Sequence, residues 1–200
     1  MAKASWVIVD PSQGSGNATV NVSSSSMHTG RNVRTTILTI TAANVEDRTV
    51  SVTQQGKPAY VDSQASAAAA KDGQNVTISG KANSARLTFS LGTGNLNVSL
   101  PSSYVAGGIT TINGNAINGD PGAVAEYDFS IVINVPANNG IEELTRQIIV
   151  TDENGHTDTC LLTQTAGDAS LTVSKTSIEL SYTGEPVTFD ITSNTNWIIK

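Results

Sequence analysis

The chain has 200 residues, of which 38% are apolar, and it carries a formal net charge of −6. Its eleven Lys and Arg residues are scattered along the sequence, which argues against the basic groove that nucleic-acid binding requires. No stretch of about 18 apolar residues occurs, so no segment predicts a membrane-spanning helix.

Thr, Val, Ser, Ile, Asn and Gly are abundant, and they are typical of strands and turns. This composition predicts an all-β protein. Ser63–Lys71 is the one stretch with helical propensity, and it is too short to form a stable helix alone. A loop or an irregular edge strand suits it equally well.

Residues 1–57 predict a first module of four strands. Ser5–Asp10 and Ala18–Ser23 are short strands, and Arg34–Gly56 is a β-hairpin in which apolar side chains alternate around the polar turn Asn44–Arg48. A sandwich of the immunoglobulin type has about seven strands in about 100 residues. We therefore expect this module to lack its opening strands.

Residues 58–167 predict a second module that is complete. Its hairpin, Leu144–Gln164, repeats the layout of the first hairpin, and such repetition indicates tandem domains of one fold. The other strands are expected at Ala59–Asp62, Asn75–Gly80, Arg86–Leu91, Leu96–Leu100 and Tyr127–Val135.

A long insert in this module, Pro101–Gly122, is rich in Gly and Asn and predicts an extended surface loop. Carbohydrate binding usually relies on exposed aromatic side chains, and aromatic residues make up only 4% of the chain. Trp6 and Trp197 lie in apolar strands and are better explained as core residues. Tyr104, in the insert, is the candidate carbohydrate-binding residue.

Residues 168–200 predict the opening strands of a third module. Strands are expected at Leu171–Val173, Ser177–Tyr182 and Val187–Thr192. Asn196–Lys200 is the counterpart of Ser5–Val9, with its tryptophan in register. The modules are therefore expected to be incomplete at both chain ends.

Open sandwiches expose strand edges that natural proteins cover or complete. We therefore hypothesise that the third segment completes a first module by strand addition, within one chain or between two copies. The predicted strand-sharing residues are Trp6, Val7, Val187, Phe189 and Trp197. The alternative is that the 200 residues belong to a longer polypeptide.

The inventory of reactive side chains favours a non-enzymatic protein without cofactors. His28 and His156 lie in polar turns, outside any recognisable catalytic motif. Glu142 and Glu143 are adjacent, whereas glycoside hydrolysis needs carboxylates that face each other. Cys160, the single cysteine, is expected to be a buried apolar side chain.

A metal site is not predicted either. Asp152, Glu153 and Asp158 could gather a weakly bound Ca²⁺ ion, but a solvated turn explains them better. One cysteine and two separated histidines cannot form a zinc site.

Several motifs of the first and third segments resemble the BACON family. In the first segment they are Trp6, Gly14–Ser23, Asn32–Thr36 and Val50–Gly56, and in the third they are Leu171–Ser174, Gly184, Phe189 and Asn194–Trp197. The middle module keeps the closing pattern Leu161–Gly167 but has Arg86 where the tryptophan would fall. The resemblance implies immunoglobulin-like β-sandwiches.

The resemblance also implies two settings. BACON domains occur in secreted glycan-degrading proteins of gut bacteria and in virion proteins of tailed phages such as the crAss-like group, with carbohydrate or mucin binding, or spacing, as the role. Because Met1–Val9 lacks the apolar core of an export signal, we expect a capsid-decorating protein made in the host cytoplasm. Its partners would be a capsid protein, copies of itself and possibly glycan or mucin. The alternative is a carbohydrate-binding module of a secreted or cell-surface protein.

Overall fold

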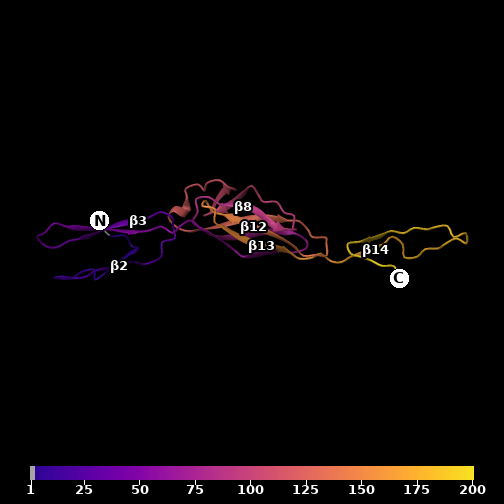
Figure 1. The fold of residues 1–200 in the computed structure, drawn as a ribbon, viewed down its shortest axis with the longest axis horizontal. Coiled ribbons are helices and arrows are strands. Elements are labelled where there is room, and N and C mark those ends of the chain that lie inside the picture. The colour runs from indigo at the N-terminus through magenta and orange to yellow at the C-terminus, as the bar shows by residue number, and fades with distance from the viewer. Residues whose placement is uncertain (1–2) are drawn as a thin grey trace.

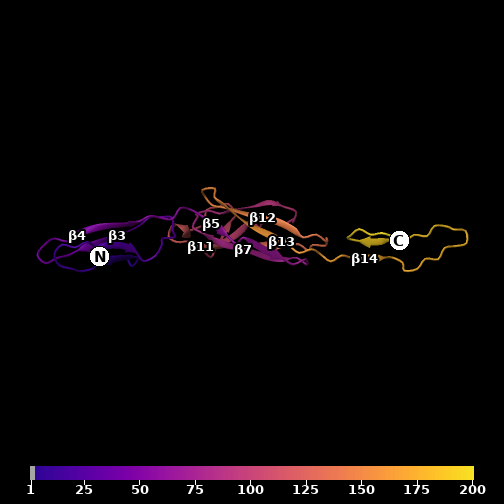
Figure 2. The same ribbon diagram turned by 60° about the horizontal axis from the view of Figure 1, so that its bottom comes forward.

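The computed structural model describes residues 3–200, and it has an all-β fold. The described part contains a single helical turn, η1 (Pro121–Ala123), and no helix long and apolar enough to cross a bilayer. Residues 3–57, 58–167 and 168–200 follow one another along the long axis, with the middle part between the other two (Figures 1 and 2).

The first segment consists of two separate antiparallel pairs. Strand β1 (Val7–Asp10) pairs with β2 (Asn21–Ser24), and β3 (Arg34–Ile40) pairs with β4 (Arg48–Gln54). The second pair is the hairpin that the sequence predicted, and its turn contains Asn44 at φ 61°. Figure 1 shows the β3 hairpin and the arm that carries β2 as two diverging arms.

The middle segment is a closed sandwich of two sheets. One sheet has the order β10-β9-β11-β7-β5, and the other has the order β6-β13-β12-β8. The strands are β5 (Val61–Ser63), β6 (Ser66–Ala69), β7 (Gln74–Ala82), β8 (Thr88–Gly94), β9 (Ser103–Ala106), β10 (Ile109–Ile112), β11 (Tyr127–Val135), β12 (Leu144–Thr151) and β13 (Thr157–Gln164). This matches the strand arrangement of an immunoglobulin-like sandwich, in which the first strand is here divided between the two sheets.

Strand β11 shows how the sequence builds the core. Tyr127, Phe129, Ile131, Ile133 and Val135 are buried, and the residues between them are half-buried or exposed. This period of two places every second side chain between the sheets. The Phe129 ring packs edge-on against Phe89, with 5.8 Å between ring centroids, and Phe89 in turn packs against Tyr104.

Cys160 lies in this core on β13, as predicted, and burial raises its pKa to about 11. In the native chain at pH 8 we therefore expect its reaction with a disulfide reagent such as Ellman's reagent to be at least about 100-fold slower than in the urea-unfolded chain. Because the folded state holds this proton more tightly, the thiol's contribution to stability is present below the unfolded pKa and fades above it. Equal native and unfolded rates would contradict the burial.

The insert Pro101–Gly122 differs from the prediction of an extended loop. It contains β9 and β10, which pair across a turn at Gly107 and Gly108, both with positive φ. Strand β9 joins β11 and so becomes part of the sandwich. The expected exposure of Tyr104 is therefore wrong: its side chain is 2% exposed, and its hydroxyl accepts a hydrogen bond from the Leu87 N–H at 3.2 Å.

Two further stretches of the sandwich test the sequence reading. Ser63–Lys71 supplies edge strand β6, which pairs in parallel with β13, so the edge-strand alternative is confirmed. The expected strand Leu96–Leu100 does not form a ladder, although Leu96 and Val98 are buried. Alternating apolar side chains can therefore mimic a strand in a segment that is buried but has no hydrogen-bonded neighbour.

The third segment forms less structure than the sequence predicted. Strand β14 (Leu171–Val173) pairs with β15 (Ile191–Ser193), and residues 174–190 between them form an extended excursion without a ladder. The strands expected at Ser177–Tyr182 and Val187–Thr192 are therefore absent, apart from the residues that begin β15. An alternating segment needs a neighbouring strand to complete its hydrogen bonds.

Candidate functional site

The first candidate surface is the apolar face of residues 3–56. Pairing of β3 with β4 places Leu38 opposite Val50, so both side chains share one face of the hairpin with Ile40. Val50 is 50% exposed and Ile40 is 52% exposed. An isolated two-stranded hairpin is marginally stable in water and gains stability when an apolar face is covered. This face is only partly covered.

The pair of β1 and β2 covers one end of that face. The Ser24 hydroxyl donates to Gln54 Oε1 at 3.1 Å, and Arg34 Nε donates to the same oxygen at 2.9 Å. The Arg34 guanidinium also lies 4.6 Å from the centroid of the Trp6 ring, a cation–π contact. These contacts join the two pairs where β3 begins and β4 ends.

The second candidate surface is the apolar face of residues 171–200. Every residue in it is exposed except Ile191 and Ser193, which are half-buried. The large apolar side chains that are more than half exposed are Leu171, Leu180, Tyr182, Trp197, Ile198 and Ile199. Large apolar side chains exposed in such number within one segment favour an interaction surface.

The five predicted strand-sharing residues are divided between these two surfaces. Val7 is buried and Trp6 is half-buried, so both already pack within the first segment. Val187, Phe189 and Trp197 are exposed, at 41%, 37% and 52%. The trio in the third segment is therefore accessible to a partner, and its role in strand sharing stays a prediction.

A polar joint fixes the first segment to the sandwich, and Arg31 is at its centre. Its guanidinium pairs with Asp120 and with Glu153 Oε1 at 3.0 Å, and its Nε donates to the Asn83 carbonyl at 2.6 Å. The Arg31 backbone N–H donates to the Gly122 carbonyl at 2.9 Å. The bonds of the charged guanidinium are charge-assisted, and bonds of this kind are short and roughly twice as strong as neutral ones.

Asn83 holds the same joint from the sandwich side. Its side chain is fully buried, its Oδ1 accepts the Tyr60 N–H at 2.9 Å, and its Nδ2 donates to the carbonyls of Thr29 and Lys57 at 3.0 and 3.2 Å. The joint is close-packed, since a Cβ on Gly30 would lie 2.2 Å from the backbone of the sandwich. Sequence reasoning missed this joint, because its residues come from loops that show no periodic pattern.

Glu126 adds a third connection. Its backbone N–H donates to Thr29 Oγ1 at 3.1 Å, and its carboxylate accepts the Tyr60 hydroxyl at 2.6 Å. This hydrogen bond lowers the pKa of Glu126, and burial raises the pKa of Tyr60. Both shifts keep the carboxylate charged and the phenol neutral, which are the forms that this contact requires.

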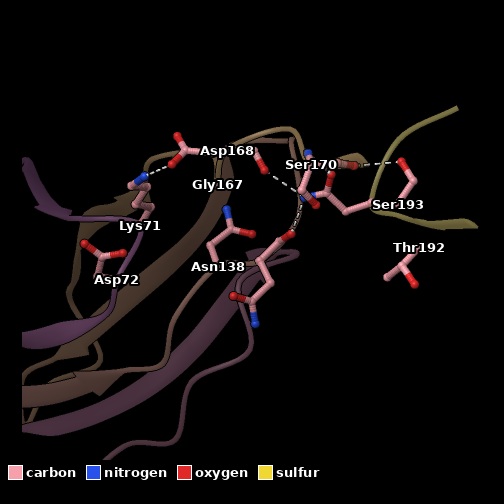
Figure 3. Close-up of a pocket in the computed structure, with 10 residues that line it drawn as sticks. Lys71, Asp72, Asn138, Gly167, Asp168, Ser170, Thr192 and Ser193 are labelled. Carbon is pink, nitrogen blue, oxygen red and sulfur yellow. Dashed lines mark hydrogen bonds and ion pairs between the residues drawn. The ribbon is translucent and has the colours of Figure 1, made fainter. Parts of the chain in front are cut away.

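A polar pocket of about 390 Å³ lies at the other joint, between the sandwich and the third segment (Figure 3). Lys71 pairs with Asp168 on one side, and Asn194 Nδ2 donates to the carbonyls of Asn139 and Asp168 at 2.9 and 2.8 Å. The lining residues include no aromatic side chain, so the pocket offers no stacking platform for a sugar ring. The side chains of Lys71 and Asn194 already bind residues across the joint and so connect the third segment to the sandwich.

The three carboxylates considered as a Ca²⁺ site each have a structural partner. Asp152 Oδ1 accepts the N–H groups of Asn154 and His156 in its own turn, Glu153 pairs with Arg31, and Asp158 accepts the Ser63 N–H. Among residues 3–200, no group of three or more His, Cys, Asp or Glu side chains is placed to hold a metal ion. His156 Nδ1 lies 2.8 Å from Asp152 Oδ2.

His28 makes a local contact only, between its Nε2 and the Asn32 carbonyl at 2.7 Å. The two histidines therefore lie in separate parts of the molecule, and each contacts a residue of its own loop.

Comparison with known proteins gives one family match. Residues 1–55 match the model of the BACON family, described as "Putative binding domain, N-terminal". No curated protein matches the chain significantly. Among solved structures, the chain is similar to an endo-fucoidan hydrolase from glycoside hydrolase family 107, at 9% identity over 82% of this chain and a TM-score of 0.31. It spans 22% of that protein's length, and a likeness this distant supports no conclusion about activity.

Proposed function

Since residues 1–55 are a BACON domain, we propose that the protein is a non-enzymatic structural protein of a phage virion. In this proposal it decorates the capsid, is made in the host cytoplasm and joins the particle during assembly. Its partners are a capsid protein and copies of itself, with strands shared between subunits, and it can also adhere to glycan or mucin.

The observation that carries this proposal is the arrangement of the modules. A closed sandwich lies between residues 3–57 and residues 168–200 (Figure 1), and both flanking segments carry exposed apolar side chains, such as Val50 in the first and Trp197 in the third. Exposed apolar faces on paired strands suit assembly with other protein chains.

A second candidate function is carbohydrate binding by a secreted gut-bacterial glycan-degrading protein. The observation in its favour is that two aromatic residues of the third segment, Tyr182 and Trp197, are exposed, because exposed rings are the usual platforms for sugars. Tyr104 cannot serve this function, since it is buried in the sandwich.

Co-sedimentation with purified crAss-like phage particles tests the two functions. We expect saturable binding of the full chain to particles stripped of their decoration proteins, at a stoichiometry that reflects capsid symmetry. Tyr182→Ala should leave this binding unchanged. If the chain instead binds a mucin column, loses that binding on Tyr182→Ala and does not sediment with particles, carbohydrate binding replaces the virion role.

A further inference from the structure

We propose that Asn118-Gly119 is a self-modification site, at which conversion of Asn118 to isoaspartate loosens the joint between the first segment and the sandwich. The pair lies beside Asp120, one of the two carboxylates that hold Arg31. The site acts without an enzyme or a partner chain, so it is independent of the virion role.

An Asn-Gly pair rearranges by a reaction of its own backbone. The glycine nitrogen attacks Cγ of the asparagine side chain, so that a new N–Cγ bond closes a succinimide ring. The Cγ–Nδ2 bond breaks, and Nδ2 leaves as ammonia with the proton that the glycine nitrogen gives up. Water then opens the ring at either carbonyl carbon and yields aspartate or isoaspartate. Glycine favours the attack because no Cβ hinders the close approach of its backbone.

The fold restrains three of the four Asn-Gly pairs in the sequence, because the glycine N–H already donates a hydrogen bond. The bonds run from Gly114 to the Leu87 carbonyl at 3.1 Å, from Gly140 to Asn138 Oδ1 at 3.0 Å and from Gly155 to the Asp152 carbonyl at 3.2 Å. Asn113 is restrained further, since its side chain bonds the Phe89 N–H at 2.7 Å and the Phe89 carbonyl at 2.9 Å. These pairs react only after local opening.

The fourth pair, Asn118-Gly119, lacks these restraints. Both residues are exposed, and among residues 3–200 neither the Asn118 side chain nor the Gly119 N–H makes a hydrogen bond. The pair forms the centre of a β-turn, which the Asp120 N–H closes by donating to the Ile117 carbonyl at 3.1 Å. Of the four pairs, this one is therefore free to react in the folded chain.

The turn is anchored on both sides, and one anchor is the joint. Before the turn, Ile117 is 3% exposed, and its N–H donates to the Ala85 carbonyl at 2.9 Å. After the turn, Asp120 pairs with Arg31, and the Gly122 carbonyl accepts the Arg31 N–H at 2.9 Å. The length of chain between these anchors is therefore fixed.

Isoaspartate adds one methylene carbon to the backbone between these anchors. Asp120 already has φ 40°, a left-handed conformation that residues other than glycine rarely adopt, and the turn holds it there. The lengthened turn cannot keep both the hydrogen bond from Asp120 to Ile117 and the ion pair of Asp120 with Arg31. The change in the backbone therefore loosens the joint, whereas conversion to aspartate adds a charge and leaves the turn intact.

Peptide mapping by mass spectrometry, during incubation of the full chain in mildly alkaline buffer, tests the site. In the folded chain Asn118 should convert at least about tenfold faster than Asn113, because Asn113 must first break its hydrogen bonds. In the urea-unfolded chain the four pairs should convert at similar rates, since glycine follows each asparagine. Slow native labelling of Cys160 verifies that the sandwich stays folded. Equal rates at Asn118 and Asn113 in the folded chain would overturn the inference.

Amide hydrogen exchange of the converted chains, isolated by ion-exchange chromatography, tests the effect on the joint. In the isoaspartate form the Arg31 N–H should exchange at least about tenfold faster than in the unconverted chain, while the N–H groups of β11 stay protected.

Two variants serve as matched controls. Freshly purified Asn118→Asp has the new charge with an ordinary backbone, and its Arg31 N–H should exchange as in the wild type. Asn118→Gln closes the corresponding larger ring far more slowly, so its joint should stay protected throughout the incubation. Fast exchange in fresh Asn118→Asp would assign the loosening to charge, and unchanged exchange in the isoaspartate form would show that the joint does not depend on the turn. Either result would overturn the inference.

Discussion

Phe129→Ala is expected to lower the free energy of unfolding of the sandwich by about 3–5 kcal/mol, the range for removing a large buried aromatic side chain. Phe129 is 2% exposed and lies on the central strand of its sheet, between β7 and β9. Its ring packs against Phe89 and lies so close to Gly80 that a Cβ there would be 2.5 Å from the ring. The surroundings are therefore too constrained to collapse into the cavity.

Urea unfolding followed by far-UV circular dichroism and by Cys160 labelling measures this loss. Tryptophan fluorescence is unsuitable, because Trp6 and Trp197 both lie in the end segments and not in the sandwich. Val132→Ala, on the solvent face of the same strand, should change stability by less than about 0.5 kcal/mol. A similar loss in both variants would show that Phe129 is not part of a packed core.

Asn83→Leu is expected to cost about 2–4 kcal/mol, because it leaves several backbone groups at the joint without partners, each worth about 1–3 kcal/mol. The substitution removes the acceptor for the Tyr60 N–H and the donors to the Thr29 and Lys57 carbonyls. Leucine keeps the number and branching of the side-chain heavy atoms but is bulkier than asparagine, so the loss reports the missing hydrogen bonds together with some overpacking. Part of it should appear as loosening of the first segment.

Amide hydrogen exchange separates the loss of stability of the sandwich from the loosening of the first segment. In the Asn83→Leu variant, the N–H groups of Tyr60 and Arg31 should exchange faster than in the wild type, while those of β11 keep their rank among the slowest. Asn118→Leu is the control, because Asn118 is exposed, and it should change neither stability nor exchange at the joint. Unchanged exchange at Arg31 would mean that Asn83 does not secure the first segment.

The hairpins were predictable from sequence because their information is local. Arg34–Ile40 and Arg48–Gln54 alternate apolar and polar side chains on either side of a polar turn, and the structure pairs them residue by residue. The same holds for β12 and β13, whose turn begins at Asp152. Where pattern and turn occur within about twenty residues, no distant contact is needed to decide the fold.

The prediction for the insert was wrong because adjacent glycines occur both in extended loops and in tight hairpin turns. The sequence places Gly107-Gly108 in an extended surface loop, whereas two residues with positive φ are also what a tight hairpin turn requires. Once that hairpin forms, β9 adds to β11 and carries Tyr104 into the core. The exposure of one candidate residue thus depended on a strand pairing that the local sequence does not specify.

The joint at Arg31 lay outside the reach of sequence reasoning for a different reason. Arg31 meets Asp120 and Glu153, which are remote from it in the chain, and each is an ordinary loop residue in its own neighbourhood. In the third segment the opposite occurs, since Ser177–Tyr182 has a strand pattern without a neighbouring strand. A periodic pattern predicts the capacity to form a strand, and a partner decides whether it forms.

The parallel pairing of β6 with β13 determines how the sandwich carries tension. The chain enters the sandwich shortly before β6 and leaves it directly after β13, and the two strands run in the same direction side by side. Tension applied through the neighbouring segments would pull β6 and β13 in opposite directions along their length. The hydrogen bonds between them would then be sheared together instead of opening one after another.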